Sequence, residues 1–132
     1  MILGCMGEDI MTLDELGAYV AERYGAVSDH SFKEDVSVTV YSRPDNRKWF
    51  AAAKNVGRRS VDAGSDGRID ILNVKLNPRE VAALRSRDGF RPAWRMNQNS
   101  WVTILLDGTV SDDEVYELVD KAFALAGKGG RR

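Results

Sequence analysis

A polar stretch between two tryptophans is the part of this sequence best suited to recognising a ligand. Between Trp94 and Trp101 lie an arginine, a methionine and four small polar residues, and an apolar segment follows directly. Polar groups beside aromatic walls are what a pocket needs to orient its ligand. We therefore predict a site for a small molecule or a protein partner at Trp94, Arg95, Asn97 and Ser100. The structural alternative is that Asn97 holds the segment through backbone hydrogen bonds and Trp101 anchors the next strand in the core.

The second candidate is a basic surface for DNA, because cations are concentrated in the middle of the chain. Residues 43–95 contain thirteen basic and six acidic side chains, a net charge of +7, whereas residues 1–42 have −6 and residues 96–132 have −2. Phosphate contacts need such cations, and Trp94 could stack on a base. The predicted DNA contacts are Arg47, Lys48, Lys54, Arg58, Arg59, Lys75, Arg91 and Arg95. The isoelectric point of about 5.8 is low for a dedicated binder, and the alternative is a solvated basic hairpin.

Catalytic chemistry has little support from the residue types. His30 is the only histidine, and no Ser/His/Asp or Cys/His arrangement can be built around it. The segment 64–67 has neither the spacing nor the lysine of a phosphate-binding P-loop. Acidic pairs at residues 14–15 and 112–113 stand at predicted helix starts, where they suit the helix dipole. We expect no catalytic residue, no metal and no cofactor, and binding rather than enzymatic activity.

The length of 132 residues predicts one domain, and no apolar run approaches the ~20 residues of a membrane span. The N-terminus lacks the basic leader and apolar core of a signal peptide. Cys5 is the only cysteine, so we expect no internal disulfide and a cytoplasmic setting. The predicted organisation is an N-terminal extension over 1–11, a single domain over 12–126 and a flexible tail over 127–132. Either Met1 or Met11 could be the biological start.

Capping patterns in the sequence mark three predicted helices, which alternate with predicted strands. Thr12 to Glu15 and Ser111 to Glu114 are capping-box patterns, and Asn77-Pro78 is a strong helix start. The predicted helices are 12–24, 78–86 and 112–126, and the predicted strands are 36–41, 47–56, 68–76 and 101–106. Apolar parity changes at residues 71/72, which predicts a bulge there. The polar connection 57–67 is expected to be the mobile tip of a long hairpin. Three consecutive strands predict an α+β fold: an antiparallel sheet of at least four strands, with the N-terminal, middle and C-terminal helices mainly on one face.

The chain resembles the MmcQ/YjbR-like family from Met11 to about Leu125, with the elements in the same order. The matching segments are Asp70-Ile71-Leu72-Asn73-Val74-Lys75, Asn77-Pro78, Leu84-Arg85, Pro92, Met96-Asn97, Trp101 and Leu106-Asp107-Gly108. The resemblance implies a compact α+β fold similar to the frataxin-like fold, which has also been likened to a double-wing DNA-binding arrangement. The family has no established activity, and DNA binding is the usual suggestion, made by analogy of fold.

The sequence departs from this family where chemistry would be expected. The family usually has Tyr-His-Met-Asn-Lys and then His-Trp, whereas this chain has Trp94-Arg95-Met96-Asn97-Gln98 and then Ser100-Trp101. Both usual histidines are therefore replaced, by Arg95 and Ser100. The usual Ser-Tyr pair near the C-terminus is Ala122-Phe123. A histidine-based mechanism could not operate here, whereas ligand recognition with altered specificity could.

Overall fold

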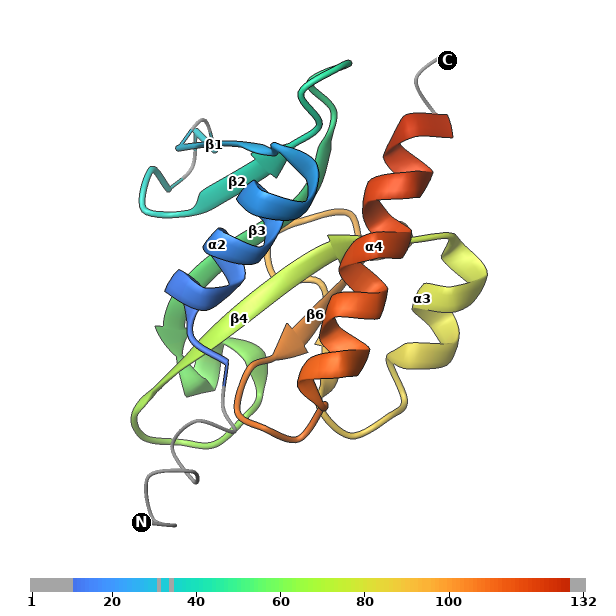
Figure 1. Ribbon diagram of the computed structural model, residues 1–132. Coiled ribbons are helices and arrows are strands. Elements are labelled where there is room, and N and C mark those ends of the chain that lie inside the picture. Colours follow the sequence, from blue (N-terminus) through green and yellow to red (C-terminus); the bar gives the residue numbers. More distant parts are fainter. Residues whose placement is uncertain (1–10, 31, 34, 129–132) are drawn as a thin grey trace, which may run out of the picture.

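The computed structural model describes residues 11–30, 32, 33 and 35–128, which form helices packed on an antiparallel sheet (Figure 1). In these residues the sheet has six strands: β1 (Val27–Asp29), β2 (Thr39–Ser42), β3 (Trp49–Gly57), β4 (Arg68–Lys75), β5 (Phe90–Pro92) and β6 (Trp101–Leu105). Their spatial order is β1-β2-β3-β4-β6-β5, and neighbouring strands pair antiparallel. The predicted α+β fold is confirmed, and the short edge strands β1 and β5 are added to it.

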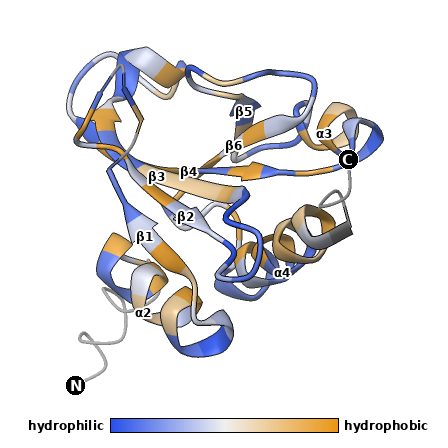
Figure 2. Ribbon diagram, turned by 90° about the horizontal axis from the view of Figure 1, so that it is seen from above, coloured by the Kyte–Doolittle hydropathy of each residue, from blue (hydrophilic) through white to orange (hydrophobic). Residues whose placement is uncertain are grey.

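The two long helices lie on one face of the sheet. Helices α2 (Leu13–Tyr24) and α4 (Asp112–Lys128) lie below the sheet in Figure 2, and the short α3 (Pro78–Leu84) contacts β6. Leu16, Val81 and Val119, one from each helix, belong to the same buried core cluster. The main core therefore fills the space between this face and the helices.

Local capping explains where the long helices begin. Thr12 Oγ1 accepts from the Glu15 N–H at 3.1 Å, and the Glu15 carboxylate accepts from the Thr12 N–H at 3.0 Å, so the predicted capping box is confirmed. Ser111 Oγ accepts from the Glu114 N–H at 3.2 Å in the same way. The Glu114 carboxylate instead forms an ion pair with Arg87 at 2.6 Å, which joins α4 to the loop after α3.

Alternation along β3 separates the two faces of the sheet. Ala51 and Ala53 belong to the helix-side core, whereas Ala52 belongs to a smaller cluster with Phe32 and Val38 on the other face. The small side chains of Ala51 and Ala53 let α4 pack against β3. We call the face opposite the helices the outer face.

The predicted bulge at residues 71/72 is wrong. The β3–β4 register runs without a shift from Ala51 opposite Val74 to Gly57 opposite Arg68. Because β4 is a central strand buried on both faces, its apolar residues need not alternate with polar ones. The irregularity in this part of the sheet lies in β2 instead, between Tyr41 and Ser42.

The first long strand begins later than predicted. β2 starts at Thr39, and Val36 is 69% exposed. The Asp35 carboxylate accepts from the Ser37 N–H at 3.0 Å and from the Ser37 hydroxyl at 2.6 Å. This local turn competes with strand pairing, so the alternating valines there do not extend the sheet.

The connection after β3 contains a short 3-10 helix, η1 (Arg58–Val61), where the sequence suggested only a polar hairpin tip. Val61 is buried and packs with Val56 and Ile69, in a cluster that also contains Ile71 and Leu105. Because β3 and β4 point these side chains to the outer face, η1 folds back over that face.

A glycine sets the path of the chain into β5. Gly89 has φ +91°, and its carbonyl accepts from the Leu105 N–H at 2.8 Å. A Cβ at this position would lie 2.6 Å from Val110 Cγ2, so only glycine fits. Gly25 also has positive φ, +65°, but a Cβ there would meet nothing within 4 Å.

The structure also bears on the predicted boundaries. Met11, which the sequence assigned to the N-terminal extension, is buried in the main core. Residues 1–10, with Cys5, and residues 129–132 lie outside the described residues. Within the part of the chain that the structure describes, no helix has the length and apolarity to cross a membrane.

Candidate functional site

A buried polar pair fixes the segment 93–100 over the outer face. Asn73 of β4 and Thr103 of β6 are opposite each other in register and only 2% and 0% exposed. The Trp94 N–H donates to Thr103 Oγ1 at 2.9 Å, and Asn73 Nδ2 donates to the Trp94 carbonyl at 2.9 Å. Thr103 Oγ1 also donates to Asn73 Oδ1, which closes the network. The backbone of Trp94 is thus held on both sides.

The sequence analysis did not select Asn73 or Thr103. Their signal was nevertheless present, because Thr103 is the one polar residue of an otherwise apolar strand and Asn73 stands between two apolar residues of β4. Buried polar groups must be hydrogen-bonded, so such a residue predicts a partner that crosses its face of the sheet. That partner is the Trp94 backbone.

Asn97 and Ser100 shape the second half of the segment. Asn97 Oδ1 accepts from the Asn99 N–H at 2.8 Å, and the Asn97 carbonyl accepts from the Trp101 N–H at 3.0 Å. The Ser100 carbonyl accepts from the Leu76 N–H at 2.9 Å. These contacts follow the structural alternative for Asn97. Trp101 is 8% exposed and lies opposite Lys75 in the sheet.

The first half of the segment forms one wall of an open pocket of about 390 Å³. The opposite wall comes from η1 and the residue after it, and β5 supplies the rest. The lining residues are Arg59, Ser60, Val61, Asp62, Arg91, Pro92, Ala93, Trp94, Arg95 and Gln98. We call this hollow the Trp94 pocket. Its lining combines apolar and cationic side chains.

The Trp94 pocket is positively charged, with three arginines and one aspartate giving a net charge of +2. In the described part of the chain, none of the five salt bridges includes Arg59, Arg91 or Arg95. Arg91 donates to the main-chain carbonyl of Asp62 from Nε and from Nη2, both at 3.1 Å, and to the Phe90 carbonyl at 2.8 Å. Carbonyls orient the Arg91 guanidinium without neutralising its charge.

Arg95 is held by the tryptophan beside it. Its guanidinium carbon lies 4.8 Å from the centre of the Trp94 ring, a cation–π contact. Arg95 has φ +57°, and Asp62 across the pocket has φ +55°. Left-handed backbone at a non-glycine residue costs about 1–3 kcal/mol and is concentrated at functional sites. Two of the three described non-glycine residues with positive φ line this pocket.

Two of the other predicted DNA contacts are engaged within the protein. Lys54 forms an ion pair with Asp35 at 3.2 Å. Hydrogen bonds from Ser37, together with the Lys54 ammonium, lower the pKa of Asp35 to about 2. Arg58 donates to the Ala63 carbonyl at 3.1 Å.

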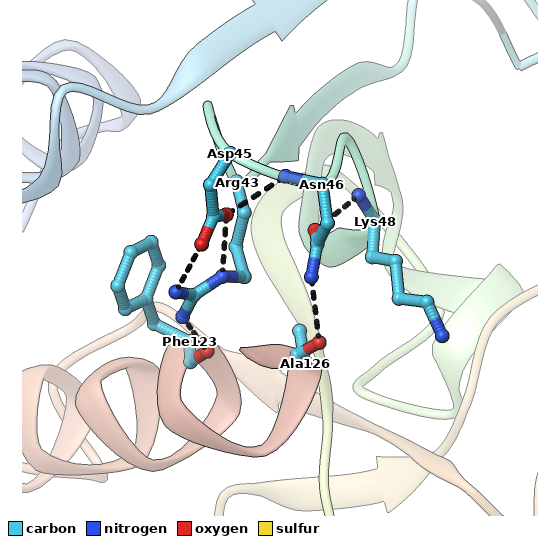
Figure 3. A network of polar contacts seen from close by, with 6 residues as sticks. All are labelled: Arg43, Asp45, Asn46, Lys48, Phe123 and Ala126. Atoms are coloured by element: carbon cyan, nitrogen blue, oxygen red, sulfur yellow. Dashed lines mark hydrogen bonds and ion pairs between the residues drawn. The ribbon is translucent and has the colours of Figure 1, made fainter. Parts of the chain in front are cut away.

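Arg47 and Lys48 lie at the far end of β3 from η1. The nine residues of β3 separate these two ends by roughly 30 Å at about 3.3 Å per residue. In the same turn, Arg43 Nη1 donates to the Phe123 carbonyl at 2.7 Å and Asn46 Nδ2 donates to the Ala126 carbonyl at 3.1 Å (Figure 3). The turn between β2 and β3 therefore caps the last turn of α4, and its cations do not share a surface hollow with Arg59, Arg91 and Arg95.

The other described residues considered for catalysis or metal binding do not form a site. His30 is exposed, and its Nδ1 lies 3.1 Å from the Val38 carbonyl oxygen. Among the residues that the structure describes, no group of three or more His, Cys, Asp or Glu side chains is placed to hold a metal ion. A second hollow of about 320 Å³ shares Asp62 and Arg91 with the Trp94 pocket and adds Asp88 and Asp107.

Known proteins resemble this chain in sequence and in fold. The family model described as YjbR matches residues 21–125. The uncharacterized protein YyaQ of Bacillus subtilis (strain 168) is 28% identical over 116 residues, covering 88% of this chain and 98% of YyaQ. The uncharacterized protein YjbR of Escherichia coli (strain K12) is 29% identical over 117 residues, covering 88% and 87%.

A solved structure gives the same relationship. The crystal structure of a protein from Pseudomonas syringae, 28% identical, matches with a TM-score of 0.81 over 88% of this chain and 99% of that one. The resemblance noted in the sequence is thereby confirmed over most of the chain, and it includes the strands and the segment that build the Trp94 pocket. The chain belongs to the YjbR family.

Proposed function

We propose that this protein is a non-catalytic binding module whose Trp94 pocket takes an anionic small molecule or an anionic group of a partner. The observation that carries the proposal is a set of three arginines around one hollow, none of which forms a salt bridge with a carboxylate among the described residues. A guanidinium binds carboxylate and phosphate groups through paired N–H donors, which makes arginine well suited to recognising such anions. The volume of about 390 Å³ falls in the ordinary range of ligand pockets, roughly 300–1,000 Å³.

The position of the cations explains why binding would be favourable. Arg95 rests on the Trp94 ring and Arg91 is oriented by carbonyls, so two of the three guanidinium groups are ordered before a ligand arrives. Ordering the binding groups in advance reduces the entropy lost on association. The exposed Pro92 and the partly buried Trp94 ring would contact the uncharged part of the ligand. A reducing, cytoplasmic compartment is proposed from the single cysteine.

Nucleic acid is the second candidate, and one observation favours it. Arg59 of η1 lines the same hollow as Arg91 and Arg95, so this part of the outer face carries three cations. A phosphate backbone could run along this part. A duplex that contacts Z phosphates should lose affinity with a slope of about −0.9Z in a plot of log affinity against log salt.

The two candidates are separated by one set of measurements. A library of small organic anions is screened by thermal shift, and hits are confirmed by calorimetry at two salt concentrations. Arg95→Ala should abolish the shift while the variant stays folded, and Arg79→Ala, at an exposed arginine of α3, should leave the shift unchanged. If no anion raises the melting temperature, but a fluorescent duplex binds with a steep salt dependence, the pocket proposal is wrong and the nucleic-acid candidate replaces it.

A further inference from the structure

We infer that the Trp94 pocket selects a phosphate monoester attached to a ring, rather than a carboxylate or an internal phosphodiester. This inference rests on the proposed function, because it names the class of anion that the same pocket takes. It is carried by the net charge of the lining, the geometry of Arg91 and Arg95, and the carboxylate of Asp62.

Charge matching favours the monoester. The lining has a net charge of +2. A phosphate monoester has a charge of about −1.5 to −2 at pH 7, whereas a carboxylate or an internal phosphodiester has −1. Of these three anions, only the monoester matches the net charge of the lining, so its Coulomb attraction to the three arginines is the strongest.

The arginines offer more donors than a carboxylate can use. Three N–H groups of Arg91 contact carbonyls, which leaves two of its five for a ligand. Arg59 and Arg95 add two further guanidinium groups from different sides of the pocket. A carboxylate has two oxygens in one plane, whereas a monoester presents three terminal oxygens on a tetrahedron, so it can meet donors arriving from three directions.

The rest of the lining describes the group attached to the phosphate. Pro92 and the Trp94 ring provide apolar surface, and the planar Arg95 guanidinium can stack on a flat ring. Arg91 uses the main-chain carbonyl of Asp62, so the Asp62 carboxylate can accept from a ligand hydroxyl or amino group. A ring phosphate with a neighbouring donor, such as a nucleoside monophosphate, matches this arrangement.

The test compares phenyl phosphate with benzoate by calorimetry, with the full chain at pH 5.5 and at pH 7.5. Phenyl phosphate should bind at least about tenfold tighter than benzoate at pH 7.5, because it gains charge-assisted hydrogen bonds. Its affinity should fall about fourfold at pH 5.5, since the second pKa of a monoester is about 6. The charged groups among the described lining residues are the three arginines and Asp62, with no histidine to titrate in this range.

Two further arms identify the source of the phosphate and the site. Adenosine 5′-monophosphate should bind better than adenosine, and a short single-stranded DNA should bind better with a 5′-phosphate than with a 5′-hydroxyl. Arg59→Ala and Arg95→Ala should each weaken phenyl phosphate by about tenfold or more, and Arg79→Ala should not change it. NMR shifts on titration should centre on the Trp94 indole.

The outcomes are distinguishable. If benzoate binds as tightly as phenyl phosphate, and Arg95→Ala abolishes both, then the monoester inference is overturned while the anion-binding proposal stands. Equal binding of the two oligonucleotides would also overturn the inference, in favour of internal phosphates. If none of these anions binds at millimolar concentration, the proposed function fails together with the inference.

Discussion

Replacing Thr103 by valine should both destabilise the fold and release the Trp94 segment. Valine has nearly the same shape, but it cannot accept from the Trp94 N–H or donate to Asn73 Oδ1. A buried polar group left without a partner costs about 1–3 kcal/mol, and this change creates two of them. Burying a methyl in place of the hydroxyl returns about 1 kcal/mol. The net loss in free energy of unfolding should therefore be about 3 kcal/mol.

The assay is urea unfolding followed by circular dichroism, with Thr109→Val as the matched control. Thr109 is exposed, so its change should stay within about 0.5 kcal/mol of the wild type. Hydrogen exchange at the Trp94 amide gives a second readout, because this N–H loses its acceptor in Thr103→Val. If Thr103→Val were as stable as the control and the Trp94 amide remained protected, the buried hydroxyl would not be what holds the segment.

Three further outcomes follow from the structure. Trp101→Ala should lose about 3–5 kcal/mol in urea unfolding because a buried ring is removed, and an unchanged midpoint would remove Trp101 from the core. Gly89→Ala should lower the melting temperature far more than Gly25→Ala, since both strain a positive φ but only the first meets a neighbouring side chain; equal losses would contradict this. Carboxyl NMR titration should give Asp35 a pKa of about 2 in the wild type and a higher pKa in Ser37→Ala. The stabilisation that Asp35 provides should be complete above its unfolded pKa of about 4 and should disappear as the pH falls through 2.

The order of the elements could be predicted because helix starts have local chemical signals. Thr12 and Asn77 cap their helices as their sequence contexts indicate. The limits of the strands were harder to predict, because strand pairing depends on residues distant in sequence. The valines near Val36 alternate with polar residues as in a strand, but a local turn formed by Asp35 takes the place of strand pairing there. The short strands β1 and β5 have three residues each, too few for a periodic signal.

The candidate site was predicted in part. The sequence grouped Arg95 and Asn97 in one candidate site, but in the structure Arg95 lines the pocket, whereas Asn97 bonds the backbone. The eight predicted DNA contacts could not be sorted by sequence, since charge density along a chain does not specify which residues meet in space. Only the fold-back of η1 brings Arg59 opposite Arg95, and that fold-back depends on the burial of Val61.

The cap that the β2–β3 turn places on α4 has a consequence for synthesis of the chain. Arg43 and Asn46 bond residues 80 positions later, and Asp120 of α4 accepts from Arg23 of α2, 97 positions earlier. Contacts of such large sequence separation form late and slowly. Helix α4 must therefore emerge from the ribosome before Arg23, Arg43 and Asn46 can make these contacts. A prematurely terminated chain ending at Leu105 would expose to chaperones and proteases the apolar surface that α4 covers.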